Sequence, residues 1–137
     1  MFEKCIYFNT NALARQINKI WDEAFKPLGL SPSHAYVLRL VLENPEISMK
    51  QIARELGLAP STISRFVDSL IIKGFLKRVS DSDDKRGTKI LPTPKAKNIQ
   101  TELEKIGQQL YTRLNGIIGK KTFSTLVTDM REIREKL

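Results

Sequence analysis

Residues 48–91 read SMKQIARELGLAPSTISRFVDSLIIKGFLKRVSDSDDKRGTKIL, and local signals divide them into two short helices and a hairpin. Ser48 is followed three residues later by Gln51, the spacing of a capping box, in which two side chains satisfy free N–H groups at a helix start. Gly57 indicates the end of this helix, because the reversal there needs positive φ. Pro60 suits the first position of the second helix, where its missing N–H costs nothing.

The second helix has two contrasting faces. Its apolar residues recur at intervals of three and four and predict the buried side: Ile63, Phe66, Val67, Leu70 and Ile71. The other side carries short hydroxyls and one arginine: Ser61, Thr62, Ser64, Arg65 and Ser69. Such groups can bond base edges in a major groove, and an arginine can bond O6 and N7 of guanine together. The alternative is an ordinary surface helix with a solvated polar face.

A basic hairpin is expected directly after this helix. Strands at 75–79 and 87–91 would be joined by a polar loop rich in turn formers. Lys85 and Arg86 at its tip would reach phosphates or the minor groove, and Asp84 would hold the Arg86 side chain in place. Taken alone, the loop fits a solvated charge run better.

Helix, turn and hairpin agree on one device, a winged helix-turn-helix that grips duplex DNA. Ala53, Gly57 and Ile63 also fall at the small, turn and core positions that two such helices require. The predicted DNA-binding residues are Ser48, Ser61, Thr62, Ser64, Arg65, Asp84, Lys85, Arg86 and Lys89. A winged helix used only for protein contact is the competing hypothesis, but it would need an exposed apolar groove where the outward face is polar.

The charge distribution supports a polyanionic partner. The 137 residues carry a net charge of +8 from 23 basic and 15 acidic side chains. Residues 1–47 are balanced, whereas 48–91 and 92–137 each hold nine basic and five acidic residues. The excess therefore lies on the predicted DNA module and on the helices after it. Basic surfaces also bind RNA or acidic lipid, so charge alone does not identify the partner.

Helical segments flank this module. We expect one helix to end near Phe25, a second to run from Ser31 to Asn44, and a long one to start after Thr93 and break at Gly119. The predicted fold is mainly α, a single domain over residues 1–137. Residues 31–93 would form the winged helix-turn-helix, and residues 1–30 and 94–137 would form dimerisation helices.

The flanking helices have apolar stripes with no partner inside the small winged module. Packing against a second copy would bury them and hold two recognition helices about 34 Å apart, the repeat of B-form DNA. The alternative is that the two ends pack on each other within one chain.

Other function classes find little support in the composition. One His, one Cys and no phosphate-binding glycine loop leave no catalytic set, so we expect no enzyme activity, cofactor or metal. The short apolar start is no signal peptide, and no apolar run reaches a membrane-spanning length. A single Cys fits a reducing, cytoplasmic compartment.

The chain resembles the MarR family of transcriptional regulators from end to end. The resemblance rests on the order of elements, on LARQINKIWDEAFKPLGLSPSHAYVLRLV, on ELGLAPSTISRFVDSLIIKGFLKR, and on DSDDKRGTKILPT. Its most specific motif is the pair Asp84 and Arg86, which implies that the aspartate positions a wing arginine in the minor groove. The family implies a homodimer that binds a pseudo-palindromic operator and usually represses transcription until an effector releases it.

The resemblance also bears on the effector. It implies a small amphipathic ligand near Trp21, His34 and Tyr36, although an aromatic residue on an apolar stripe is also an ordinary core residue. Peroxide-sensing members carry a reactive Cys in the first helix. Here the sole Cys is Cys5, and Tyr7 stands nearer the sensing position, so a plain half-buried Cys5 is the alternative to a redox sensor.

Overall fold

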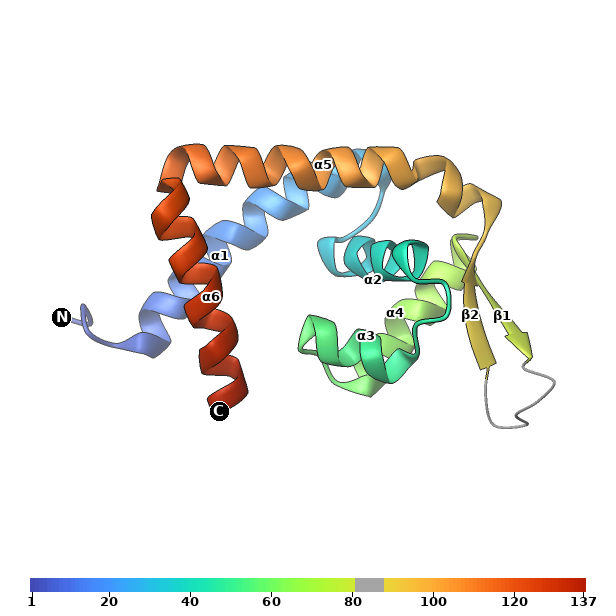
Figure 1. Cartoon of the computed structure of the whole chain (residues 1–137), viewed down its shortest axis with the longest axis horizontal. Helices are drawn as coiled ribbons and strands as arrows, with labels where there is room; N and C mark the ends of the chain where they lie inside the picture. The colour runs from blue at the N-terminus through green and yellow to red at the C-terminus, as the bar shows by residue number, and fades with distance from the viewer. Residues whose placement is uncertain (81–87) are drawn as a thin grey trace. The chain divides into compact units, whose positions relative to one another are not determined.

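The computed structural model of the chain describes residues 1–80 and 88–137 (Figure 1). Its elements are, in chain order, α1 (Ile6–Phe25), the 3-10 helix η1 (Lys26–Leu28), α2 (Pro32–Glu43), α3 (Met49–Leu56), α4 (Pro60–Ile72), β1 (Leu76–Ser80), β2 (Thr88–Pro92), α5 (Pro94–Ile118) and α6 (Lys120–Lys136). The prediction of a mainly α fold with a two-stranded wing is confirmed.

The helix ends lie where the local signals predicted them. Ser48 and Gln51 form the complete capping box, with bonds of 3.1 Å from the Gln51 N–H to the Ser48 Oγ and 2.9 Å from the Ser48 N–H to the Gln51 Oε1. Gly57 has φ 65°, and the Leu58 N–H reaches back to the Ala53 carbonyl at 3.0 Å. This is the bond pattern of a Schellman motif, which turns the chain from α3 toward α4.

Both strands begin and end one residue later than predicted. They pair antiparallel from Leu76 opposite Pro92 to Ser80 opposite Thr88. The shift has a local cause at Phe75, whose N–H donates to the Leu70 carbonyl at 2.9 Å. Because this N–H closes the end of α4, it is not available to the sheet, and only the Phe75 carbonyl bonds across the ribbon, to the Thr93 N–H at 3.0 Å.

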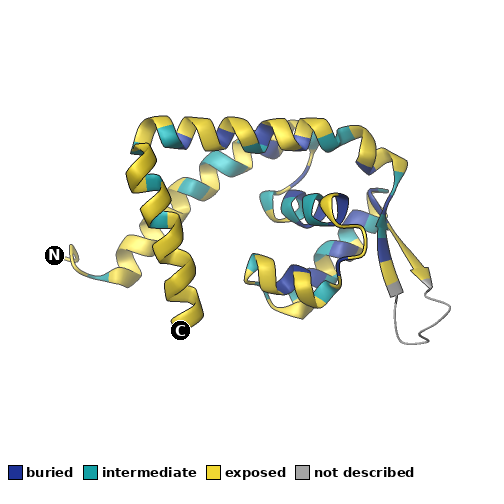
Figure 2. Cartoon of the chain, in the orientation of Figure 1, coloured by how far each residue is buried: buried dark blue, intermediate teal, exposed yellow. Residues whose placement is uncertain are grey.

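The chain forms two compact units, residues 1–104 and 105–137. In the first unit α4 packs against α2, α3 and β1, and β2 packs against α2. Figure 2 shows many of the buried residues in these elements; they include Val37, Leu38, Val41, Ile52, Ile63, Val67, Leu70, Leu76 and Ile90. On the predicted inner face of α4, Phe66 and Ile71 are only half-buried.

The second unit holds the end of α5 and all of α6. Gly119, with φ 93°, separates the two helices as predicted. The rings of Tyr111 and Phe123 meet edge to face across the corner, 5.4 Å apart. Within α6, which is described throughout its length, no residue is buried. The predicted roles of 1–30 and 94–137 as dimerisation helices stay predictions.

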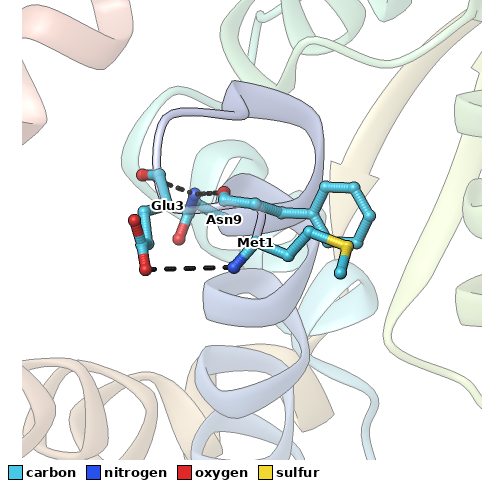
Figure 3. A network of polar contacts seen from close by, with 4 residues as sticks. Met1, Glu3 and Asn9 are labelled. Carbon is cyan, nitrogen blue, oxygen red and sulfur yellow. Dashed lines mark hydrogen bonds and ion pairs between the residues drawn. The ribbon is translucent and has the colours of Figure 1, made fainter.

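The first residues fold back onto the start of α1 (Figure 3). The Asn9 side-chain amide donates to the carbonyls of Cys5 at 2.8 Å and Phe2 at 3.1 Å, and the α-amino group of Met1 lies 3.8 Å from the Glu3 carboxylate. Phe2 stacks on Phe8 with 4.4 Å between ring centroids. Cys5 is half-buried at the N-cap of α1 rather than within the helix.

Candidate nucleic-acid interface

The outer face of α4 is a continuous exposed ridge. Ser61, Arg65, Asp68 and Ile72 are exposed and follow each other at intervals of four, three and four residues, which places them on one side of the helix. Thr62, Ser64 and Ser69 are half-buried along its margins. Four predicted contact residues, Ser61, Thr62, Ser64 and Arg65, therefore lie together on or beside this ridge, in the first half of the helix.

The packing beneath α4 holds the ridge in position. Ile63, Val67 and Leu70 are completely buried on the opposite side of the helix. From α2, the His34 ring meets the Phe66 ring edge to face, with 4.8 Å between centroids. Burial, and secondarily the charge of Lys73, lower the pKa of His34. His34 is thus a packing residue for α4 that favours its neutral form.

Ser48 has a structural role that was also visible in the sequence. Its hydroxyl oxygen accepts the Gln51 N–H at the start of α3, and the residue is exposed. A hydroxyl that accepts one bond still has its own hydrogen to donate, for example to a phosphate oxygen. Capping and DNA contact are therefore compatible at this residue.

The remaining predicted contact residues belong to the wing. Asp84, Lys85 and Arg86 lie outside the described residues, so their predicted roles stay predictions. Lys89 is exposed on β2, opposite Val79 of β1. Cross-strand partners share one face of a two-stranded ribbon.

An ion pair joins the wing to α4 and was not found from the sequence. The Arg78 Nη2 on β1 donates to the Asp68 Oδ1 on α4, and both side chains are about half exposed. The available signal was the position of Asp68, seven residues after Ser61 on the same helix face. Its partner could not be read from the sequence, because it depends on how the ribbon crosses α4.

Further bonds anchor the base of the wing to the end of α4. The Thr93 hydroxyl donates to the Gly74 carbonyl at 2.6 Å, and the Lys95 ammonium donates to the Lys73 carbonyl at 2.7 Å. The same ammonium lies 4.6 Å from the centre of the Phe75 ring. These contacts attach both the wing and the start of α5 to the helix that carries the ridge.

The three residues predicted near an effector are divided between two sides of α2. The Trp21 indole N–H donates to the Tyr36 hydroxyl at 3.0 Å, which joins α1 to α2, and the Arg39 guanidinium lies 5.6 Å from the centre of the Tyr36 ring. His34 instead faces Phe66 of α4. The structure brings Trp21 and Tyr36 together and places His34 apart from them.

Metal sites and membrane spans are two other classes of feature that the described part of the chain lacks. Within residues 1–80 and 88–137, no three His, Cys, Asp or Glu side chains are grouped so that they could hold a metal ion. Over the same residues, no helix is both long enough and apolar enough to span a bilayer.

Comparisons with known proteins agree with this geometry. The MarR family model matches residues 28–87. The Bacillus subtilis (strain 168) protein YybA, an uncharacterised HTH-type transcriptional regulator, is 28% identical over 127 residues, which cover 90% of this chain and 85% of YybA. The crystal structure of the transcriptional regulator SlyA superposes with a TM-score of 0.83 at 25% identity, covering 97% of this chain and 94% of SlyA.

The fold is also that of CouR. The transcriptional repressor CouR bound to a 23-mer DNA duplex has a TM-score of 0.85 at 20% identity, covering 96% of this chain and 94% of CouR. CouR from Rhodococcus jostii RHA1 bound to p-coumaroyl-CoA has a TM-score of 0.82 at 22% identity, covering 98% and 94%. The MarR family match over the winged core, together with the same fold on both sides of it, makes this chain similar to HTH-type transcriptional regulators of the MarR family.

Proposed function

We propose that this protein is a ligand-responsive repressor that binds a pseudo-palindromic DNA operator as a homodimer in the cytoplasm. The observation that carries the proposal is the ridge of α4, where Ser61 and Arg65 stand exposed beside an antiparallel wing. A helix whose outer face is polar and whose inner face is buried fits a major groove, and the adjoining hairpin fits the backbone or the minor groove. Three of the four ridge residues are polar, with Ile72 the exception, and this argues against a winged helix used only for protein contact.

The terminal helices support the homodimer. Both are described in full, and α1 buries only Phe25 while α6 buries no residue, although both carry apolar stripes. Large apolar side chains stand exposed on them: Ile6, Tyr7, Phe8 and Leu13 on α1, and Val127, Met130 and Ile133 on α6. Exposed apolar surface on this scale is typical of a subunit interface. A second copy offers the same surfaces in return, as a closed two-fold dimer requires.

The response to a ligand rests on fold similarity and on one junction. CouR, which shares the fold, was solved both with p-coumaroyl-CoA and with DNA. In this chain Trp21 and Tyr36 form a contact between α1 and α2, and α2 packs directly on α4. A ligand that separates Trp21 from Tyr36 would act on the helix that supports the ridge.

Sequence-specific binding is tested by selecting bound duplexes from a random pool and measuring their affinity by fluorescence anisotropy. We expect an enriched two-fold-symmetric motif, with log affinity falling by about 0.9 per neutralised phosphate for each decade of salt. Arg65→Ala is expected to relax the preference at one base pair in each half-site, a loss of about 1–3 kcal/mol of discrimination. Arg86→Ala is expected to weaken binding to all duplexes alike.

Lys136→Ala on α6 is the charge-matched control for both variants, because it lies outside the candidate surface. The proposal fails if no motif is enriched and the Arg65 and Arg86 variants bind like the wild type. Binding to a protein partner that survives nuclease treatment would then favour the protein-contact module.

A further inference from the structure

The ridge of α4 contains an acidic residue, although the phosphates of DNA repel a carboxylate. Asp68 is exposed, and it follows Ser61 and Arg65 at helical spacing on the face proposed to enter the major groove. An unpaired carboxylate on this face would repel the phosphates on either side of the groove. The role of Asp68 must therefore be sought in what it contacts.

Its partner is Arg78, which lies on the inner face of the wing. Arg78 stands opposite Ile90 in the ribbon, and Ile90 is buried, so this face of the ribbon is turned toward the core and α4. Lys77 and Val79 lie on the other face, by the alternation of a strand. Arg78 thus reaches from the wing to the ridge, where its Nη2 meets the Asp68 Oδ1.

This contact uses only part of the guanidinium. An arginine has five N–H donors arranged in a planar fork. Among the described residues, Asp68 is the only partner of the Arg78 guanidinium, reached through one nitrogen, and 41% of the Arg78 side chain is accessible. Within residues 1–80 and 88–137 the Nε and Nη1 donors bond no acceptor, and the accessible side chain can offer them to a phosphate while Asp68 holds Nη2.

The place of Arg78 between α4 and the wing predicts that its second acceptor is a DNA phosphate. With a helix in the major groove and a hairpin at the neighbouring minor groove, one DNA strand runs between the two elements, and its phosphates face that space. Arginine is suited to such a group, because its fork bonds phosphate oxygens in pairs. A half-exposed ion pair contributes little to stability, so stability alone does not account for the contact.

We propose that Asp68 is a positioning residue that holds Arg78 against the DNA backbone, so that Arg78 makes a phosphate contact between the recognition helix and the wing. This inference rests on the DNA-binding function proposed above. It adds a contact that is independent of base sequence, joined to the ridge that reads the sequence. By holding the arginine in advance, Asp68 reduces the side-chain freedom that is lost on binding.

The test compares Asp68→Asn with the wild type by anisotropy, on the selected operator and on a duplex of random sequence. Simple charge repulsion predicts tighter binding, because the variant removes a negative charge from the DNA-facing side. Positioning predicts the opposite, a loss of about threefold to tenfold on both duplexes. In an Arg78→Ala background the loss should disappear, and Asp68→Asn should then leave affinity unchanged or raise it.

The salt dependence identifies the phosphate contact itself. Arg78→Ala is expected to weaken binding about tenfold or more and to lower the slope of log affinity against log salt by about 0.9 for each subunit. Arg78→Lys keeps the charge without the fork, so it should keep the slope but lose the effect of Asp68→Asn. Lys136→Ala is again the matched control, and melting curves verify that each variant is folded.

Two results would overturn the inference. One is tighter binding by Asp68→Asn, and the other is an Arg78→Ala slope equal to that of Lys136→Ala. Both are measured on the random duplex as well as on the operator, since phosphates are present in either. Failure of the proposed function has a separate signature, the absence of any enriched operator motif.

Discussion

Ser48 and Arg65 are both exposed polar residues, but their surroundings give them different roles. Ser48 bonds the backbone of α3 and so affects folding. Arg65 stands on the α4 ridge with its buried neighbours on the other side of the helix, so its removal should affect binding and leave folding unchanged. A polar side chain that bonds the protein's own backbone affects folding, whereas one that points to solvent from an exposed face affects binding.

Ser48→Ala removes one side of the capping box and leaves an N–H of the first turn of α3 without its acceptor. We expect the free energy of unfolding to fall by about 0.5–2 kcal/mol, the usual cost of losing such a cap. Urea denaturation measures this loss. Ser33→Ala, at an exposed position in the first turn of α2, is the matched control and should change stability by much less. Equal effects of the two substitutions would contradict the capping role.

At the scale of elements, each helix end and each contact between elements of the winged helix-turn-helix depends on one or two residues. Gly57 turns α3 into α4, and His34 packs α2 against Phe66 on α4. The ion pair of Asp68 and Arg78 joins α4 to β1. The orientation of α4 is therefore fixed by three contacts: the turn at its start, the packing of α2 on its inner side, and the ion pair with the wing.

Gly57→Ala tests the turn between the two helices. At φ 65° an alanine Cβ crowds the backbone, so we expect a loss of roughly 1–2 kcal/mol of unfolding free energy. Gly116→Ala is the matched control, since Gly116 lies within α5 and has open space around the added Cβ. That substitution should stabilise the helix by up to about 1 kcal/mol. Chemical denaturation should give opposite signs for the two variants.

The lowered pKa of His34 predicts how stability depends on pH. Its pKa in the folded protein lies below the ordinary value of 6.5, because the ring is partly buried and, secondarily, because the positive charge of Lys73 disfavours a second charge there. The unfolded chain therefore binds this proton more readily as the solution is acidified. The contribution of neutral His34 is fully present above pH 6.5 and is lost as the pH falls from there toward the folded pKa.

His34→Phe removes the titrating group and keeps an aromatic ring against Phe66. His34 is the only histidine of the chain, so the difference between wild type and variant isolates this residue. Urea midpoints measured between pH 7.5 and about 5 should fall more steeply for the wild type. Parallel curves for the two proteins would show that His34 does not couple pH to folding.

At the scale of the whole molecule, the apolar faces of α1 and α6 are the surfaces proposed to pack against a second copy. Met130 and Ile133 are each more than 40% exposed on α6, and Tyr7 is 66% exposed on α1. One recognition helix makes few contacts, whereas two held together bind as a single unit with a much higher effective concentration. Dimerisation and operator affinity should therefore be lost together.

Met130→Glu introduces a charge into the proposed subunit interface. Light scattering on the wild type should give twice the chain mass of 15.7 kDa, and the variant should approach a single chain. Its affinity for the two-fold operator is expected to fall by about a hundredfold or more. Thr125→Glu adds the same charge on the other side of α6 and should leave both quantities unchanged. A variant that remains a dimer and binds normally would exclude α6 from the interface.

Features with local causes were correctly predicted from the sequence. The capping box of Ser48, the turn at Gly57, the starts of α2 and α5 at their prolines and the break at Gly119 each depend on residues one helical turn apart or less. The same holds for Ile63, Val67 and Leu70 on the inner face of α4 and for the exposed Ser61 and Arg65 on its outer face, because helical spacing alone places them; Phe66 and Ile71, predicted on the inner face, are only half-buried.

Features that require two elements to meet were settled only by the tertiary structure. The pairing of Asp68 with Arg78, the separation of His34 from Trp21 and Tyr36, and the late start of the wing after Phe75 all depend on how helices and ribbon pack. Backbone signals act over a few residues and carry no information about which distant side chain comes close. That choice follows from burying the apolar faces together, which is a property of the folded chain.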